Sequence, residues 1–191
     1  AYNILLLMVI AGIIGIGTSS IVAVLGSAGL AVGLALQGSL SNLAGGVLIL
    51  LLKPFRVGDY IITAGAEGTV MSIDIFYTRI ATTDNKVVVI PNGTISNSNV
   101  TNTTKQDERM LVLEFTVSLD ANIEEVKTEI MKLIESNERI LHEMNRCVVV
   151  DKLTPVNIKM QAKAWTKSED YWDVKYLLLE QISIVLQGFR G

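Results

Sequence analysis

The side chains that most often do chemistry in proteins are scarce in this sequence and form no catalytic or metal-binding pattern. The one histidine, His142, has no cysteine or aspartate at a ligand spacing, and the one cysteine, Cys147, opens the apolar run 147–150. We therefore expect a surface histidine and a buried structural thiol. The glycines before Gln37 are not followed by the Gly-Lys-Ser/Thr signature of a phosphate-binding loop. The sequence predicts no enzyme activity, no cofactor and no metal site.

The charged residues divide the chain into two parts. All 16 Lys and Arg and all 19 Asp and Glu residues lie from Lys53 onward. The first quarter is therefore typical of a membrane segment, and the rest is typical of a soluble body. The net charge of −3 argues against a nucleic-acid partner, because nucleic-acid-binding proteins usually carry a basic face.

The first cations indicate how the chain lies across a membrane. Lys53 and Arg56 follow the last apolar residue, and positive charge beside a span marks the cytoplasmic side. We expect the soluble body in the cytoplasm and both cations at the lipid headgroups. The earlier apolar stretch, 4–16, is shorter than the ~20 residues that a span needs. We therefore interpret residues 1–17 as the C-terminal part of a transmembrane helix.

Residues 18–52 are rich in small residues, which fall into stripes when 21–36 is drawn as a helix. Leu30 and Leu34 are four residues apart and share one face. One flank, displaced by about 100°, carries glycines, and the opposite flank, displaced by a similar angle, carries alanines. The glycine stripe is Gly26, Gly29 and Gly33, and the alanine stripe is Ala28, Ala31 and Ala35.

This asymmetry suits a ring of identical helices. Small residues let helix backbones approach closely in membranes, and a glycine flank meeting an alanine flank is a heterologous contact that closes into a cyclic oligomer. The inward face would carry Leu30 and Leu34, and rings of leucine block ions by dewetting. On this helix alone, an ordinary membrane helix pair with lipid-facing leucines is the alternative.

The second half of this stretch predicts a bent, interfacial helix. Gly38 lowers the helix propensity by ~1 kcal/mol relative to alanine, so we expect a break at Gln37–Gly38. Apolar residues then recur at helical spacing over 39–52, and polar residues occupy the first turns, as in a helix at a membrane interface. Gly45 and Gly46 are interpreted as a second soft point, and Lys53–Pro54 ends the helix.

Several motifs in order resemble the bacterial small-conductance mechanosensitive channels, the MscS family. They are Gly29–Gly38, Ser41–Gly46, Pro54–Asp59, Gly68–Ile73, Thr78 and Ile90–Gly93. The resemblance implies a homoheptamer in the bacterial inner membrane, with Leu30 and Leu34 as gate rings and Gly38 as a kink. It also implies a cytoplasmic vestibule with side portals, further membrane helices before the pore helix and a C-terminal barrel. The last two features are not contained in these residues, so we expect a longer, multi-pass protein.

The soluble body has two parts by pattern. Residues 53–105 contain short β-branched runs separated by turn signals, and the resemblance implies an Sm-like β-domain there. The expected strands are 60–63, 68–75, 77–82 and 86–90, with a turn at Pro91–Gly93. Residues 106–191 follow the order βαββα, which predicts an α+β domain with helices at 123–134 and 170–186 and Asn122 as an N-cap.

The function that these patterns predict is a channel opened by membrane tension, with membrane lipids as its surroundings and ions and small osmolytes as its permeants. Asn42 is expected to meet the β-domain near Gly93 in a closed or inactivated state. Two alternatives stay open: a channel of the same architecture gated by a ligand or partner, and a membrane scaffold that does not conduct.

Overall fold

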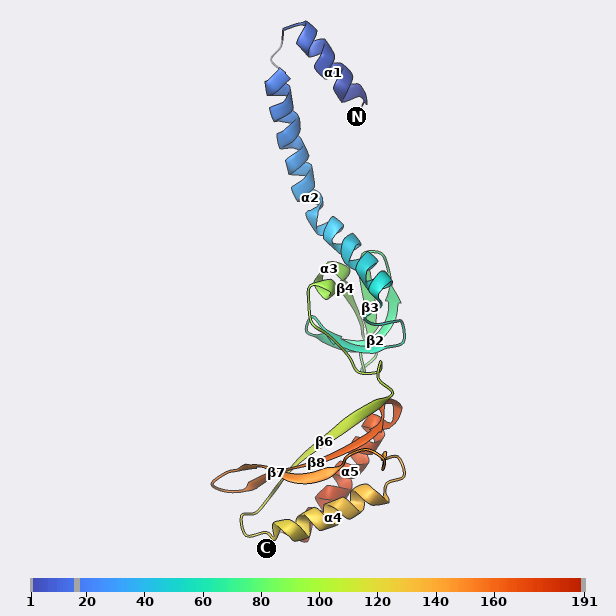
Figure 1. Ribbon diagram of the computed structural model, residues 1–191, viewed down its shortest axis with the longest axis vertical. Coiled ribbons are helices and arrows are strands. Elements are labelled where there is room, and N and C mark those ends of the chain that lie inside the picture. The colour runs from blue at the N-terminus through green and yellow to red at the C-terminus, as the bar shows by residue number, and fades with distance from the viewer. Residues whose placement is uncertain (1, 16–17, 190–191) are drawn as a thin grey trace. The chain divides into compact units, whose positions relative to one another are not determined.

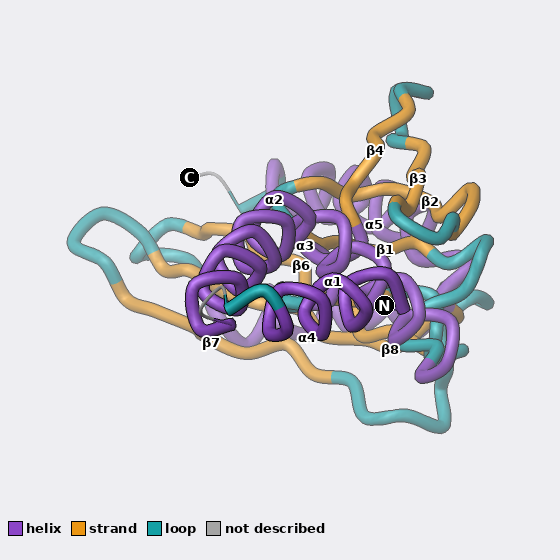
Figure 2. Tube along the Cα trace, turned by 90° about the horizontal axis from the view of Figure 1, so that it is seen from above, coloured by secondary structure: helices purple, strands orange, loops and turns teal. Residues whose placement is uncertain are grey.

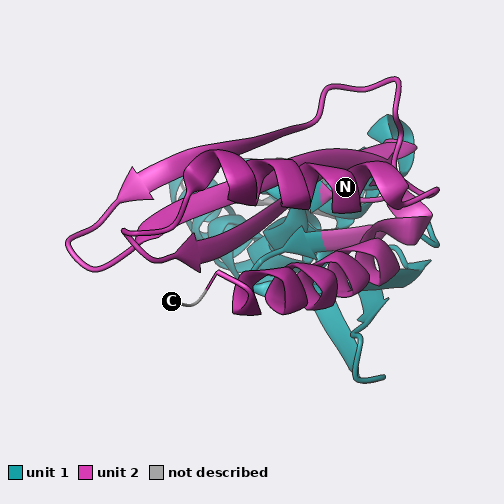
Figure 3. Cartoon of the chain, turned by 90° about the horizontal axis from the view of Figure 1, so that it is seen from below, with its two compact units in different colours: residues 1–58, 62–101 teal, residues 59–61, 102–191 magenta. Residues whose placement is uncertain are grey.

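The computed structural model describes residues 2–15 and 18–189 (Figure 1). The chain divides into two compact units (Figure 3): residues 1–58 with 62–101, and residues 59–61 with 102–191. Among the described residues, the first unit contains three helices and most of a small sheet, and the second contains a three-stranded sheet with two long helices.

The uncharged N-terminal quarter is helical. Helix α1 spans Tyr2–Ile13 and helix α2 spans Thr18–Leu52. Over Ser19–Leu52 helix α2 is long and apolar enough to cross a membrane, and among the described residues it is the one helix with that property. Residues 16 and 17 of the expected segment 1–17 lie outside the described residues.

The prediction that the helix breaks at Gln37–Gly38 is wrong, because helical structure runs unbroken through both residues. The ribbon changes direction about midway along α2 (Figure 1). A single glycine costs a helix only ~1 kcal/mol, which is enough to soften it without ending it. The helix ends at Lys53 as expected: its backbone has φ of 47°, and its N–H donates to the Ile49 carbonyl.

A five-stranded sheet follows, in the order β4-β3-β2-β1-β5. The pairing of β3 with β2 and β4 is antiparallel, and β3 and β4 form the hairpin at the upper right of Figure 2. The turn before β2 has Ala64 and Gly65 at positive φ, and the hairpin turn has Asn85 at φ 61°. The strands are β1 (Tyr60–Thr63), β2 (Ala66–Ile73), β3 (Tyr77–Ala81), β4 (Val87–Pro91) and β5 (Val100–Asn102).

Two short elements differ from the sequence prediction. The expected turn at Pro91–Gly93 is instead the start of helix α3, Asn92–Ser96, and the strand β5 was not predicted. Pro91 precedes the helix with φ of −60°, which suits an N-cap residue with extended ψ. The strand β5 has only three residues, too few to show an alternating pattern.

The second unit is an α+β fold, as predicted. Its antiparallel sheet has the order β6-β8-β7, and α4 and α5 contribute residues to one hydrophobic core with these strands. The elements are β6 (Glu108–Val117), α4 (Ile123–Ser136), β7 (Cys147–Leu153), β8 (Ile158–Lys167), η1 (Ser168–Asp170) and α5 (Tyr171–Gln187).

Local predictions in this unit have mixed outcomes. Asn122 caps α4, since its side chain accepts from the Glu125 N–H, and His142 is exposed. The expected burial of Cys147 is wrong: the residue is only partly buried, whereas Val148 is buried. Successive side chains of a strand point to opposite faces, so the burial of Val148 in the core turns Cys147 away from it.

Candidate functional site

The two leucines of the expected gate lie on the surface of α2 in the single chain. Leu30 is 66% exposed and Leu34 is 62% exposed. Side chains of this size on a helix that is not covered by its own chain require cover by lipid or by another protein surface. Their role as a gate stays a prediction.

The small residues on the flanks of α2 are also unpacked. A Cβ atom added at Gly26, Gly29, Gly33 or Gly38 would meet nothing within 4 Å. The alanine stripe, Ala28, Ala31 and Ala35, is exposed. Contacts within the part of the chain that the structure describes therefore give no reason for the small residues. Close approach by another helix is the contact that small residues permit.

The C-terminal part of α2 has a different environment, because it is docked on the β-domain. A Cβ atom at Gly45 would lie 2.6 Å from the Asn92 carbonyl oxygen. One at Gly46 would collide with the Ile75 carbonyl oxygen and lie 2.6 Å from Asn92 Nδ2. Both glycines are buried. Close backbone approach accounts for them without a hinge, and their role as a soft point stays a prediction.

Asn42 and Gly93 are in direct contact. The Gly93 N–H donates to Asn42 Oδ1 at 2.9 Å. The contact is tight: a Cβ atom at Gly93 would lie 2.8 Å from Ser41 Oγ and 2.9 Å from Asn42 Oδ1. The side chain of Asn42 in α2 thus accepts from one of the first backbone N–H groups of α3, which have no partner within that helix.

Asn92 organises the surface that receives α2, and the sequence analysis assigned it no role. It is fully buried, its Oδ1 accepts from Thr78 Oγ1 at 2.8 Å, and its Nδ2 donates to the Asp74 carbonyl at 2.8 Å. These bonds connect α3 to the turn that carries Ile75. A sequence signal existed, since Asn92 follows a proline at the end of an apolar strand, but it also fits an ordinary turn.

The charged residues near α2 lie at its C-terminal end. Lys53 is the first residue after the helix, and Arg56 lies in the following loop; both side chains are exposed. Cations are favoured at helix C-termini by the helix dipole. The pKa of the exposed Asp84, in the β3–β4 turn, is lowered by hydrogen bonds with Lys86 and Thr82. The Asp84 carboxylate stabilises the β3–β4 turn and is not part of this site.

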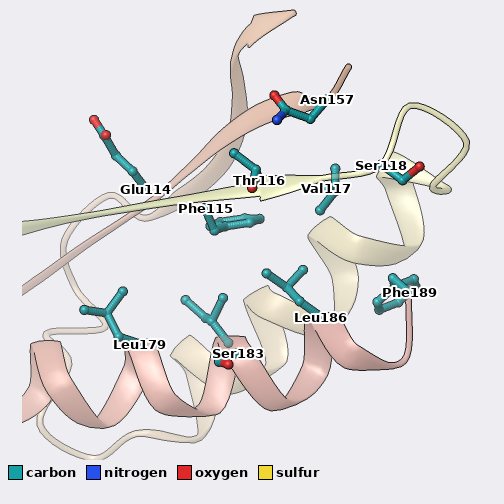
Figure 4. A pocket seen from close by; sticks show the side chains of 11 residues that line it. Glu114, Phe115, Thr116, Val117, Ser118, Asn157, Leu179, Ser183, Leu186 and Phe189 are labelled. Carbon is teal, nitrogen blue, oxygen red and sulfur yellow. The ribbon is translucent and has the colours of Figure 1, made fainter. Parts of the chain in front are cut away.

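The second unit contains an open pocket of about 450 Å³ between β6 and α5. Figure 4 shows Phe115 of β6 pointing toward Leu179 and Leu186 of α5, with Asn157 on the opposite side of the strand. No histidine or cysteine lines the pocket, and no group of His, Cys, Asp and Glu that could hold a metal occurs in the described part of the chain. Its one carboxylate, Glu114, accepts from Gln161 Nε2 at 3.3 Å. The pocket offers apolar contact and no catalytic pair.

Comparison with known proteins gives consistent matches over both units. The β-domain of mechanosensitive ion channels matches residues 38–105, and the C-terminal domain of the mechanosensitive ion channel MscS matches residues 111–187. An uncharacterised MscS family protein of Buchnera aphidicola subsp. Baizongia pistaciae is 40% identical over 167 residues, which are 85% of this chain and 59% of the relative. The small-conductance mechanosensitive channel of Edwardsiella ictaluri is 40% identical over 162 residues, 85% of this chain and 57% of that channel.

A solved structure agrees with these matches. The crystal structure of Helicobacter pylori MscS in its closed state has a TM-score of 0.86 and 31% sequence identity, covering 96% of this chain and 73% of that chain. The present chain spans less of its curated relatives, 59% of the Buchnera protein and 57% of the Edwardsiella channel. The order of the matched domains, the identity and the shared fold together show that the chain belongs to the MscS family, a family of mechanosensitive channels and not of enzymes.

Proposed function

We propose that this chain is the subunit of a homoheptameric channel that opens under membrane tension and lets ions and small osmolytes leave the cell after hypoosmotic shock. The observation that supports this most is the state of α2. The helix is apolar enough to cross a membrane, yet none of its most apolar stretch is buried by its own chain. Its leucine face and its glycine and alanine flanks are all exposed. Further copies of α2 would cover all three surfaces.

In this proposal Leu30 and Leu34 form two rings around the pore axis. Water leaves a narrow leucine-lined constriction, and ions cannot pass a dewetted segment. Tension favours the conformation with the larger area in the bilayer, and ligand-free gating of this kind is a shift between two populated states. As the helices tilt, the glycine flank of each helix slides along the alanine flank of its neighbour, and both leucines leave the pore axis. The glycine flank is Gly26, Gly29 and Gly33, and the alanine flank is Ala28, Ala31 and Ala35.

The rest of the architecture follows the family. Residues 18–52 form the pore helix with its kink at Gly38, residues 53–105 the β-domain, and residues 106–191 the second cytoplasmic domain. The full-length protein is multi-pass and lies in the bacterial inner membrane with these two domains in the cytoplasm, where they enclose the vestibule. The cations Lys53 and Arg56 mark the cytoplasmic membrane face.

The bond between Asn42 and Gly93 holds α2 against the β-domain in a closed or inactivated state. The 2.9 Å hydrogen bond supports this role. A double-mutant cycle of Asn42→Ala and Gly93→Ala, read as the rate of current decay under sustained suction, is expected to be non-additive. Additive effects of the two substitutions would remove the proposed role.

The function is tested by osmotic downshock. Cells that lack their own mechanosensitive channels are expected to survive dilution when they express the full-length protein, and to lyse when they express none. Equal lysis in both cultures, with the protein confirmed in the membrane, would refute solute release. A channel that needs a cytoplasmic ligand would rescue cells but give no current in pure lipid. A scaffold that does not conduct would neither rescue cells nor give a current.

A further inference from the structure

The turn between β7 and β8 carries two apolar side chains that the second unit leaves uncovered. Val156 is 77% exposed and Leu153 is 66% exposed, more than any other large apolar side chain that the structure describes in this unit. Figure 1 shows this turn extending past the ends of α4 and α5. Turns favour glycine, proline, asparagine, aspartate and serine, so folding alone does not account for an exposed valine here. We call Leu153 and Val156 the knob.

The turn holds the knob in one conformation. The Thr154 N–H donates to the Asn157 carbonyl at 2.9 Å, and Thr154 Oγ1 donates to the same carbonyl at 2.7 Å. The Asn157 N–H donates back to Thr154 Oγ1 at 3.0 Å. Pro155 fixes a further backbone dihedral. Because the turn is already ordered, little conformational entropy is lost when a partner covers the knob.

The second unit also has an uncovered apolar surface that is concave, the pocket of about 450 Å³ between β6 and α5. Its apolar lining includes Phe115, Leu179, Leu186 and Phe189, which pack against the core but are only partly buried. Figure 4 shows Phe115 facing Leu179 and Leu186 across the opening. Water is removed favourably from such a surface when another apolar surface covers it. We call this pocket the groove.

The knob does not fill the groove of its own chain. Asn157, at the end of the turn, lines the groove, so the turn begins beside it. Leu153 and Val156 do not line the groove. The unit therefore has a convex and a concave apolar surface that leave each other uncovered.

The charges beside the two surfaces are of opposite sign. The hairpin 147–167 carries four lysines and one carboxylate, whereas the one charged residue that lines the groove is the exposed Glu114. At the base of the knob, Lys152 faces Lys159 across the β7–β8 pair, and like charges placed opposite each other destabilise a sheet. Neither lysine makes an ion pair within residues 2–15 and 18–189.

These features select a second copy of this chain as the partner. A small apolar molecule in the groove would leave the knob uncovered, whereas a second copy covers one surface with the other. It also brings the lysines of the hairpin toward a carboxylate. Because the knob and the groove are different surfaces, the contact is heterologous, and it repeats from copy to copy until a ring closes.

We propose that the knob of each subunit enters the groove of the next, so that the second units form a continuous ring of contacts. The inference rests on the proposed function in one respect, the assembly of several copies. It goes further in naming the two surfaces that meet outside the membrane, Leu153 with Val156 on one copy and the wall between β6 and α5 on its neighbour.

The test is disulfide cross-linking of the full-length protein in the membrane. In a background with Cys147 and any cysteine outside this chain replaced by serine, two differently tagged chains are co-expressed. One carries Val156→Cys, and the other carries Ser183→Cys, at an exposed position that lines the groove. Mild oxidation should yield a dimer with both tags, since a disulfide forms only between cysteines with Cα atoms within about 7 Å.

The matched control replaces Ser183→Cys by Leu177→Cys, which is 46% exposed on the same helix but outside the groove, and should give no mixed dimer. When every chain carries both Val156→Cys and Ser183→Cys, linked products should grow beyond two chains, because each contact leaves a knob and a groove for further copies. Products that stop at two chains, equal linking through Leu177→Cys, or no mixed dimer from chains shown to share a complex would each overturn the inference.

A second measurement needs no cysteine. Val156→Ser changes an exposed side chain, so the fold should tolerate it. Exchange of subunits between two tagged populations in detergent should become about a hundredfold faster, since burial of one valine contributes a factor of about ten and release of one subunit breaks two contacts. Leu177→Ser is the control and should leave the exchange rate unchanged. Equal rates for Val156→Ser and wild type would contradict the contact.

These readouts need neither tension nor conduction. An assembled, conducting protein without the link between knob and groove would overturn this contact and leave the proposed function standing. A protein that links in this way but never conducts would overturn the proposed function alone.

Discussion

The glycines of α2 fall into two groups at the residue scale, although they look alike in the sequence. Gly26, Gly29, Gly33 and Gly38 face open space within the chain, whereas Gly45 and Gly46 touch the backbone of the β-domain. The first group would be explained by contacts between copies, and the second is explained by a contact within the chain. Substitutions with alanine separate the two explanations.

Gly46→Ala is expected to destabilise the chain, because its Cβ atom would collide with the Ile75 carbonyl. Overpacking of this kind costs roughly 1–3 kcal/mol, and each kcal/mol lowers Tm by about 2–4 °C for a chain of this size. Gly38→Ala is the matched control: it meets nothing within 4 Å and should leave Tm unchanged or raise it. Equal Tm for the two variants in a thermal melt would show that the docking contact is not formed.

Leu34→Ser is expected to make the channel leaky, because a ring of hydroxyl groups holds water where leucines exclude it. Cells expressing it should grow more slowly than wild type, and the opening threshold should fall. Leu36→Ser is the control, since residues two apart on a helix point about 200° apart and Leu36 is also exposed. Slow growth with both variants, or with neither, would contradict a pore-facing Leu34.

The limits of the sequence are clearest at these glycines. Gly45 and Gly46 were interpreted as a soft point because a missing side chain signals flexibility and close approach equally well. Which of the two applies depends on the Ile75 and Asn92 backbone, which is distant in sequence. The pair Asn42 and Gly93 was predicted, but only through the family resemblance and not from spacing.

At the scale of elements, a buried polar network positions the surface on which α2 rests. Asn92 bonds to the Thr78 hydroxyl and to the Asp74 carbonyl, and it also contacts Gly46. A buried polar group that loses its partner costs about 1–3 kcal/mol. The network therefore makes the position of α3 depend on β3 and on the turn before it.

Thr78→Val is expected to lower Tm by several degrees, because it leaves Asn92 Oδ1 without its donor and costs about 1–3 kcal/mol. Thr63→Val is a matched control in the same sheet. Thr63 is 3% exposed, and its Oγ1 has no hydrogen-bond partner among the described residues, so valine there should be neutral or stabilising. A larger loss of Tm at Thr63 than at Thr78 would contradict the network.

Periodicity and turn signals predicted most elements of the soluble body. Strand β1 has the predicted bounds, and the helices α4 and α5 lie within two residues of theirs. The elements that were missed are stabilised by tertiary contacts: α3 by Asn92 and Asn42, and β5 by pairing at the sheet edge. Five- and three-residue segments carry too little pattern of their own to compete with a turn interpretation.

At the scale of the whole molecule, the number of copies in the assembly depends on contacts between chains, which a single chain does not contain. The exposed leucines and small residues of α2 need cover, and a ring of copies supplies it without any further partner. The mass of the full-length complex in detergent counts the copies directly. Seven is the expected number, and any other number would overturn the homoheptamer while leaving the family assignment unaffected.

The most direct test of the account is patch-clamp recording of the full-length protein, purified and reconstituted in lipid alone, with suction applied to the patch. We expect stepwise currents that appear with suction and whose threshold moves when Leu30 or Leu34 is changed. Silence up to patch rupture, with insertion confirmed, would contradict gating by membrane tension and favour a channel controlled by a ligand or a partner, or a scaffold that does not conduct.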